Sequence, residues 1–114
     1  MNYFSRELVA ATTKPLLLAI LFQGENYGYE IIRMVHCLSE GKLEWSDGLI
    51  YPVLHRLEEQ KLIKSRWVRH ENQKMRKYYA LTKKGQAELC KEKEQWAKAN
   101  ALMQQLFNGL PCSI

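Results

Sequence analysis

Hydrophobic residues recur every three or four positions over the N-terminal part of the chain, a spacing that is typical of amphipathic helices. Over residues 5–22 this spacing predicts a first helix, which Pro15 should bend because its ring removes a helical hydrogen bond. After a polar turn at residues 23–26, a shorter helix is expected from residue 27 or 28 to residue 38. Gly41 closes it, since glycine adopts the left-handed backbone conformation freely.

A third helix is predicted to begin after Ser46, because its hydroxyl can accept a hydrogen bond from an otherwise unpaired backbone amide. Asp47 favours the same start, since a carboxylate complements the positive end of a helix, and the helix should run to about residue 60. Pro52 lies inside this stretch, so either the first turn is loosened or the helix begins later, near Tyr51. The hydrophobic residues of the stretch share one buried face: Leu49, Ile50, Val53, Leu54 and Leu57.

Polar and apolar residues then alternate over residues 63–70 and again over residues 75–82, which is typical of β-strands. The polar residues 71–74 join the two stretches and complete a β-hairpin. We expect three aromatic residues to supply the packing that holds the hairpin: Trp67, Tyr78 and Tyr79.

Thr82 can cap a long final helix that runs to about residue 107, because the chain contains no proline between these positions. Leu89, Trp96 and Met103 follow one another at intervals of seven residues, the spacing of a coiled-coil seam. A chain of 114 residues is too short to cover this seam itself, so a symmetric homodimer is expected. The expected interface takes one residue from the first helix and the others from the last: Leu8, Leu89, Trp96, Ala99, Met103 and Leu106.

Three helices, the third short and outward-facing, followed by a two-stranded hairpin, are the order of elements in a winged helix-turn-helix. The predicted fold is therefore mainly α with a small β-hairpin. We expect a winged-helix domain over residues 1–84, whose N-terminal helix contributes to the dimer. A dimerisation helix over residues 83–108 and a flexible tail over residues 109–114 follow.

The longest apolar run, residues 15–22, is much shorter than the roughly 18 to 20 residues that cross a bilayer, and it lacks the cleavage pattern of a secretory signal. A cytoplasmic protein without a membrane partner is therefore expected. Cys37, Cys90 and Cys112 are odd in number and widely spaced, which favours free thiols in a reducing compartment.

Positive charge is concentrated in one segment. Residues 61–84 hold nine of the seventeen Lys and Arg residues but only one of the twelve acidic residues. This segment carries a net charge of +8, while the remainder of the chain is mildly acidic. Because a dense cationic segment raises the local potential where a polyanion would dock, nucleic acid is the first expected partner.

In a winged helix the third helix enters the major groove, where base edges differ, and the basic wing follows phosphates or the minor groove. The candidates for base or groove contact lie in the third helix: Ser46, Gly48, Tyr51, Pro52 and His55. Arg56, on the same helix, is a candidate for a phosphate contact. The other candidates for phosphate contact lie in the hairpin: Lys64, Arg69, Lys74, Arg76 and Lys77. Each of these could instead be an unengaged surface cation, whereas phosphate contacts would make binding strongly salt-dependent.

Three segments, in their order and spacing, resemble the PadR family of bacterial transcriptional regulators: NYGYEIIRMV at 26–35, GLIYPVLHRLEEQKLIKSRW at 48–67 and RKYYALTKKG at 76–85. The resemblance covers about residues 16–85. It implies a winged-helix homodimer that represses transcription from an inverted-repeat operator and releases the DNA when a small molecule binds. It also suggests that Tyr27 and Tyr29 touch the DNA backbone, although both could simply pack the second helix.

The single C-terminal helix is similar to that of the compact subgroup of this family. In multidrug-sensing members, a tryptophan on the last helix meets its symmetry mate and sandwiches a flat aromatic ligand. Trp96 stands at that position, and Asn100, one turn further on, could add a polar contact. Trp96 could equally be an ordinary residue of the dimer core, and Lys93 is a cation where a drug pore would favour apolar or acidic lining. A different effector, or none, therefore stays open.

Other classes of function are less well supported. Ser46, Asp47 and His55 lie on the expected DNA face, so an enzyme is not expected, and neither is a cofactor. His36 and Cys37 suggest a metal- or redox-sensing repressor, but adjacent helical residues point about 100° apart and no CxxC spacing is present. A winged helix can also be a protein-interaction module, which would favour an apolar patch over a cationic wing.

Overall fold

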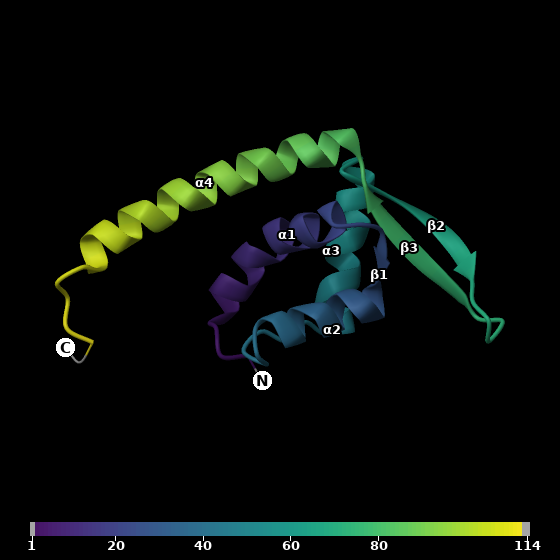
Figure 1. Ribbon diagram of the computed structural model, residues 1–114, viewed down its shortest axis with the longest axis horizontal. Coiled ribbons are helices and arrows are strands. Elements are labelled where there is room, and N and C mark those ends of the chain that lie inside the picture. Colours follow the sequence, from purple (N-terminus) through teal and green to yellow (C-terminus); the bar gives the residue numbers. More distant parts are fainter. Residues whose placement is uncertain (1, 113–114) are drawn as a thin grey trace.

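The computed structural model describes residues 2–112, and within them the chain forms four helices and a three-stranded antiparallel sheet (Figure 1). The elements follow one another as α1 (Arg6–Phe22), β1 (Asn26–Tyr27), α2 (Gly28–Leu38), α3 (Asp47–Glu59), β2 (Ile63–Arg69), β3 (Met75–Leu81) and α4 (Lys83–Phe107). The predicted fold class, mainly α with a β-hairpin before the last helix, is confirmed. Residue 1 of the predicted winged-helix domain and residues 113–114 of the predicted tail lie outside the described residues.

Hydroxyl groups begin helices α3 and α4 as expected. Ser46 accepts a backbone amide hydrogen bond of 3.2 Å, so that α3 starts at Asp47. Thr82 begins α4 through a corresponding bond of 3.0 Å. Pro52 therefore lies inside α3, and the alternative start of this helix near Tyr51 is wrong.

The sheet contains one strand that the sequence pattern does not predict. β1 pairs antiparallel with β3, with Asn26 opposite Tyr79, so that the strand order is β1-β3-β2. The polar pattern predicts a turn at Asn26, because two residues are too few to show the alternation of a strand. The hairpin of β2 and β3, which we call the wing, is paired in register from Ile63 opposite Leu81 to Arg69 opposite Met75.

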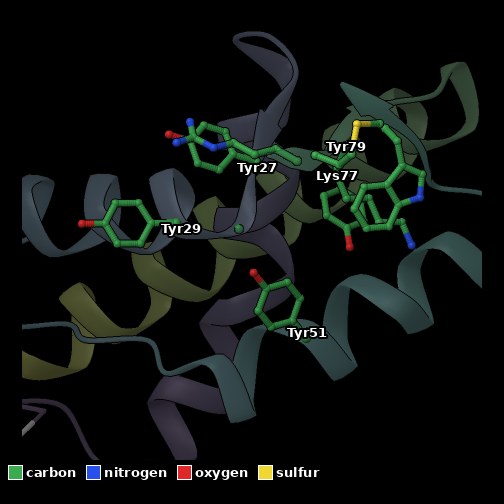
Figure 2. Close-up of a pocket in the computed structure, with 9 residues that line it drawn as sticks. Tyr27, Tyr29, Tyr51, Lys77 and Tyr79 are labelled. Carbon is green, nitrogen blue, oxygen red and sulfur yellow. The ribbon is translucent and has the colours of Figure 1, made fainter. Parts of the chain in front are cut away.

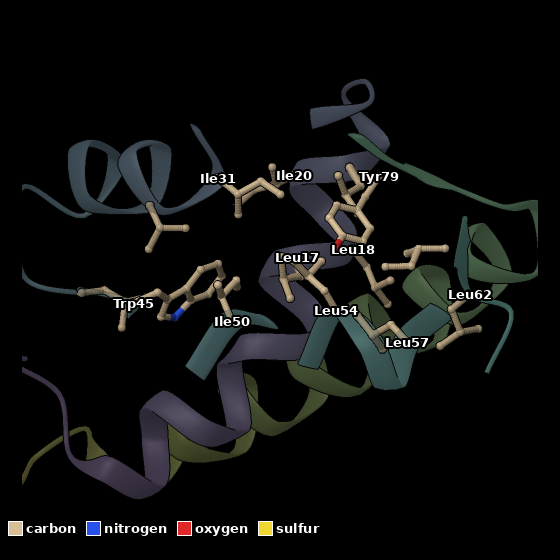
Figure 3. Packing of buried hydrophobic residues seen from close by; sticks show 14 of the residues in the cluster. Leu17, Leu18, Ile20, Ile31, Trp45, Ile50, Leu54, Leu57, Leu62 and Tyr79 are labelled. Carbon is tan, nitrogen blue, oxygen red and sulfur yellow. The ribbon is translucent and has the colours of Figure 1, made fainter. Parts of the chain in front are cut away.

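The core lies where α1, α2 and α3 meet the base of the sheet (Figure 3). Leu17 and Leu18 of α1, Ile31 of α2, and Ile50 and Leu54 of α3 are fully buried. Burying aliphatic side chains of this size contributes about 1.5–3 kcal/mol each. Because the apolar face of α3 packs into this core, its other face is exposed to solvent.

Helix α4 runs along α1 and then continues past the rest of the molecule (Figure 1). Toward its C-terminal end, apolar side chains face solvent, including Met103 and Leu106, which are 40% and 65% exposed. Much of the expected dimer seam is therefore uncovered in the isolated chain. Among the described residues, no helix is both long enough and apolar enough to cross a membrane.

Candidate nucleic-acid interface

Helix α3 and its cap turn one side toward solvent. The six residues of this region that are predicted to contact DNA are all exposed: Ser46, Gly48, Tyr51, Pro52, His55 and Arg56. The opposite side packs into the core through Ile50, Leu54 and Leu57. A recognition helix in the major groove needs one face that packs on its own domain and one face that is open to the DNA, and α3 has both.

His55 and Arg56 differ in their partners. Nε2 of His55 lies 3.0 Å from Oε1 of Glu59, one turn along the helix. Arg56 forms no ion pair with any carboxylate in the part of the chain that the structure describes. A phosphate or base edge would therefore compete with Glu59 for His55, whereas Arg56 is available.

Two carboxylates tie the wing to the helical body. Glu58 of α3 accepts a 2.5 Å hydrogen bond from the hydroxyl of Ser65 in β2 and lies 3.8 Å from Nζ of Lys77 in β3. Glu25, in the turn before β1, binds the guanidinium of Arg66 through both carboxylate oxygens, and this hydrogen bonding lowers the pKa of Glu25. These contacts hold the middle of the wing against α3 and against the turn before β1.

The wing carries the five hairpin cations that are predicted to contact phosphates. Within residues 2–112, four of them form no ion pair: Lys64, Arg69, Lys74 and Arg76. Arg76 instead lies over the ring of Tyr27, with 4.6 Å between its Cζ and the ring centroid. Lys77 differs, because Glu58 partly neutralises it and its ammonium lies 5.9 Å from the ring centroid of Trp67.

Trp67 does not pack in the way that the sequence suggests. Its side chain is 62% exposed, whereas Tyr79 is 5% exposed and does supply the expected packing. Met75, diagonally across the hairpin on the same face, is 47% exposed. The alternating pattern holds a signal for this, because it places Trp67 on a face with the polar residues Ser65 and Arg69.

A groove of about 680 Å³ opens between the start of α2, helix α3 and the wing (Figure 2). We call it the aromatic groove, because five aromatic side chains line it: Tyr27, Tyr29, Tyr51, Trp67 and Tyr79. Its charged lining residues are Arg76 and Lys77. The groove thus brings together five of the residues that are expected to contact DNA: Tyr27, Tyr29, Tyr51, Arg76 and Lys77.

A second cleft, also of about 680 Å³, lies between α1 and α4. Its apolar lining comes from both helices: Pro15, Leu16, Ala19, Phe22, Leu89 and Trp96. Lys93 is the only charged residue among those that line this α1–α4 cleft. Asn100, the other predicted ligand contact, does not line it and is exposed.

A short chain of polar contacts orients Trp96. Its indole Nε1 donates a 3.1 Å hydrogen bond to Oε2 of Glu92. Lys14 of α1 lies 3.6 Å from the other oxygen of Glu92 and 2.5 Å from Oε2 of Glu88. The hydrogen bond between Lys14 and Glu88 raises the pKa of Lys14 and lowers that of Glu88. These contacts join α1 to α4 beside the Trp96 ring.

The cysteine and histidine residues do not form a metal site in the part of the chain that the structure describes. Across residues 2–112 no three His, Cys, Asp or Glu side chains are grouped so that they could hold a metal ion. Cys37, Cys90 and Cys112 are exposed free thiols. His36 lies 3.6 Å from a carboxylate oxygen of Glu44.

Comparison with known proteins finds similarity to regulators of transcription. Residues 17–91 match the model of the family described as "Transcriptional regulator PadR-like family". Transcriptional regulator YqjI of Escherichia coli strain K12 is 38% identical over 80 residues, which cover 70% of this chain and 37% of that protein. This chain therefore spans well under half the length of that curated relative.

Solved structures are similar over nearly their full length. A PadR family transcription regulator from Clostridium difficile R20291 has a TM-score of 0.74 at 31% identity, and the match covers 85% of this chain and 99% of that one. A transcriptional regulator from Clostridium thermocellum has the same fold, with a TM-score of 0.81 at 24% identity and coverage of 90% and 96%.

Proposed function

Because this chain belongs to the PadR-like family of transcriptional regulators, we propose that it is a homodimeric repressor that binds an inverted-repeat operator and leaves it when a small aromatic effector binds. Families of transcriptional regulators are generally not enzymes. The proposal has three parts, which are DNA binding by α3 and the wing, dimerisation through α4, and effector binding in the α1–α4 cleft.

DNA binding is supported by one observation above all. The exposed face of α3 lies beside a wing that Glu58 and Glu25 hold in place, and within residues 2–112 most cations of this wing have no carboxylate partner. A helix held in this way can enter the major groove while the wing reaches phosphates. In this proposal α3 supplies sequence recognition and the wing supplies affinity.

Dimerisation is supported by the exposure of α4. The side chain of Leu8 on α1 is 41% exposed, and those of Met103 and Leu106 on α4 are 40% and 65% exposed. Exposed apolar side chains favour association when a partner covers them, and a two-fold axis lets the same residues of two copies cover one another. Sedimentation at micromolar concentration tests this part, since a species of 13.4 kDa would contradict it.

An effector site is supported by the apolar α1–α4 cleft and by Trp96, whose flat indole can stack on a planar compound. The volume of about 680 Å³ lies within the range of small-molecule sites. Lys93 is its only charged lining residue, so the cleft favours an aromatic effector that carries a negative charge, such as a phenolate or carboxylate.

The test of DNA binding uses a duplex from the region upstream of the gene. We expect the full chain to bind it with an affinity that falls steeply as salt concentration rises. Replacing exposed Lys74 by Ala should weaken binding uniformly across sequences. It should also reduce the salt slope, which is the slope of the logarithm of the binding constant against the logarithm of the salt concentration, by about one. Lys98→Ala, at an exposed position of α4, is the matched control and should leave both the affinity and the salt slope unchanged. Absence of binding at low salt would contradict the proposal.

A further inference from the structure

The wing exposes a large apolar surface on the side that faces α3. Trp67 is 62% exposed and Met75 is 47% exposed, although both lie on the face of the hairpin that buries Tyr79 at its base. An indole that stays exposed to water on a small hairpin contributes little to the stability of the fold, because aromatic side chains stabilise a protein or a complex most when their faces are covered. Something that binds in the aromatic groove would cover these two side chains.

The charges of the groove indicate what covers them. Arg76 and Lys77 are its charged lining residues, and no carboxylate lines it. The ammonium of Lys77 lies 5.9 Å from the ring centroid of Trp67 and 5.7 Å from that of Tyr79, so a cation stands directly beside the aromatic surface. The occupant must therefore present negative charge and apolar surface at short intervals.

We infer that the aromatic groove holds one strand of the duplex, with deoxyribose rings against Trp67 and Met75 and the neighbouring phosphates near Lys77 and Arg76. A nucleic-acid strand alternates anionic phosphates with less polar sugars, and contacts to the phosphates and sugars carry no sequence information directly. The lining of the groove includes residues of α2, α3 and the wing, so a strand that lies in it would contact all three elements.

The two sides of the groove are positioned by contacts outside it. Glu58 lies 3.8 Å from Nζ of Lys77 and holds Ser65 in the neighbouring strand, which keeps the wing face turned toward α3. On the opposite side, Tyr51 of α3 and Tyr29 of α2 complete the lining (Figure 2). Trp67 is thus a DNA-contacting residue in addition to those of α3 and the wing cations, and this assignment rests on the proposed DNA binding.

The test uses tryptophan fluorescence of the full chain. Trp45 is 3% exposed, so acrylamide quenching in a Trp96→Phe variant reports mainly on Trp67. A random-sequence duplex at low salt should reduce this quenching at least about twofold, because sugar contacts do not depend on sequence. Trp67→Ala should weaken duplex binding about tenfold because the apolar area of the indole is no longer buried, and Trp67→Phe should retain most of the affinity.

The control is Tyr3→Ala, which removes an aromatic ring that is 75% exposed but lies outside the groove, and it should leave affinity unchanged. If the duplex binds while Trp67 stays fully quenchable and Trp67→Ala keeps its affinity, the groove inference is overturned and DNA binding stands. If the unaltered chain binds no duplex even at low salt, DNA binding itself fails.

Discussion

The hydroxyl of Tyr51 in α3 lies against Cα of Gly28, the first residue of α2. A Cβ at position 28 would lie 2.4 Å from the tyrosine oxygen and 2.8 Å from Cζ of the ring. Such separations are far below van der Waals contact, so any other residue at this position must displace Tyr51. The glycine therefore determines where the Tyr51 ring sits in the aromatic groove.

Gly28→Ala should consequently impair DNA binding more than folding. The Tyr51 side chain is 45% exposed and can swing away, and alanine favours a helix, so the free energy of unfolding should change by less than about 1 kcal/mol. The displaced ring would narrow the groove, and we expect duplex affinity to fall about tenfold in fluorescence anisotropy. Combining Gly28→Ala with Tyr51→Ala should cost no more than Tyr51→Ala alone. Additive losses in this cycle would contradict the explanation.

Gly85 should matter for folding more than for DNA binding, because the atom nearest to it belongs to the backbone and not to a movable side chain. A Cβ there would lie 2.0 Å from the carbonyl oxygen of Leu62, which also accepts hydrogen bonds from the amide and hydroxyl of Thr82. Since this carbonyl is held in place, Gly85→Ala should lower the free energy of unfolding by about 2 kcal/mol in urea denaturation. Gly48→Ala is the matched control, because its nearest neighbour would lie at 3.8 Å, and it should be neutral or slightly stabilising. Equal stability of the two variants would contradict this account.

The helices and the two strands of the wing could be predicted from the sequence because each has a strong local signal. Ser46 and Thr82 begin helices through their hydroxyl groups, and the alternation of residues in the wing predicts its pairing. The two-residue strand β1 has no such signal, since it exists only through its pairing with β3. Local patterns therefore suffice for helices and hairpins but not for short strands that tertiary contacts create.

The candidate site could be predicted only in part, for a similar reason. Exposure of the α3 residues follows from helical spacing, so it could be anticipated. The aromatic groove depends on the approach of Tyr51 to Gly28 and on the bond between Glu58 and Ser65, which join separate elements. No single-segment pattern contains these contacts, so the groove between α3 and the wing is not predicted from the sequence.

The contact between Lys14 and Glu88 should make the joining of α1 and α4 dependent on pH. The pKa of Glu88 is lowered by its hydrogen bond with Lys14, so its contribution is present above the usual pKa of glutamate and is lost as pH falls through the lowered value. The pKa of Lys14 is raised, so its contribution is lost only in strong alkali. A double-mutant cycle of Lys14→Met and Glu88→Gln on the free energy of unfolding should give a coupling energy of about 0.5–1 kcal/mol near neutral pH. The coupling energy should be clearly smaller at about pH 3. The more exposed pair of Lys98 and Glu94 is the control and should couple more weakly.

Lys93 should select the charge of a compound that binds in the α1–α4 cleft. With Trp67 replaced by Phe and Trp45 buried, quenching of fluorescence reports binding at Trp96. We expect 2-naphthoate to bind more tightly than the uncharged 2-naphthamide, because the two share a ring system and differ in the charge that Lys93 can meet. Lys93→Gln should weaken naphthoate about fivefold and leave naphthamide unchanged, as an exposed ion pair is worth about 1 kcal/mol. Lys91→Gln, on the same helix but outside the cleft, is the control. Equal losses for both compounds would show that Lys93 acts on the shape of the cleft and not through its charge.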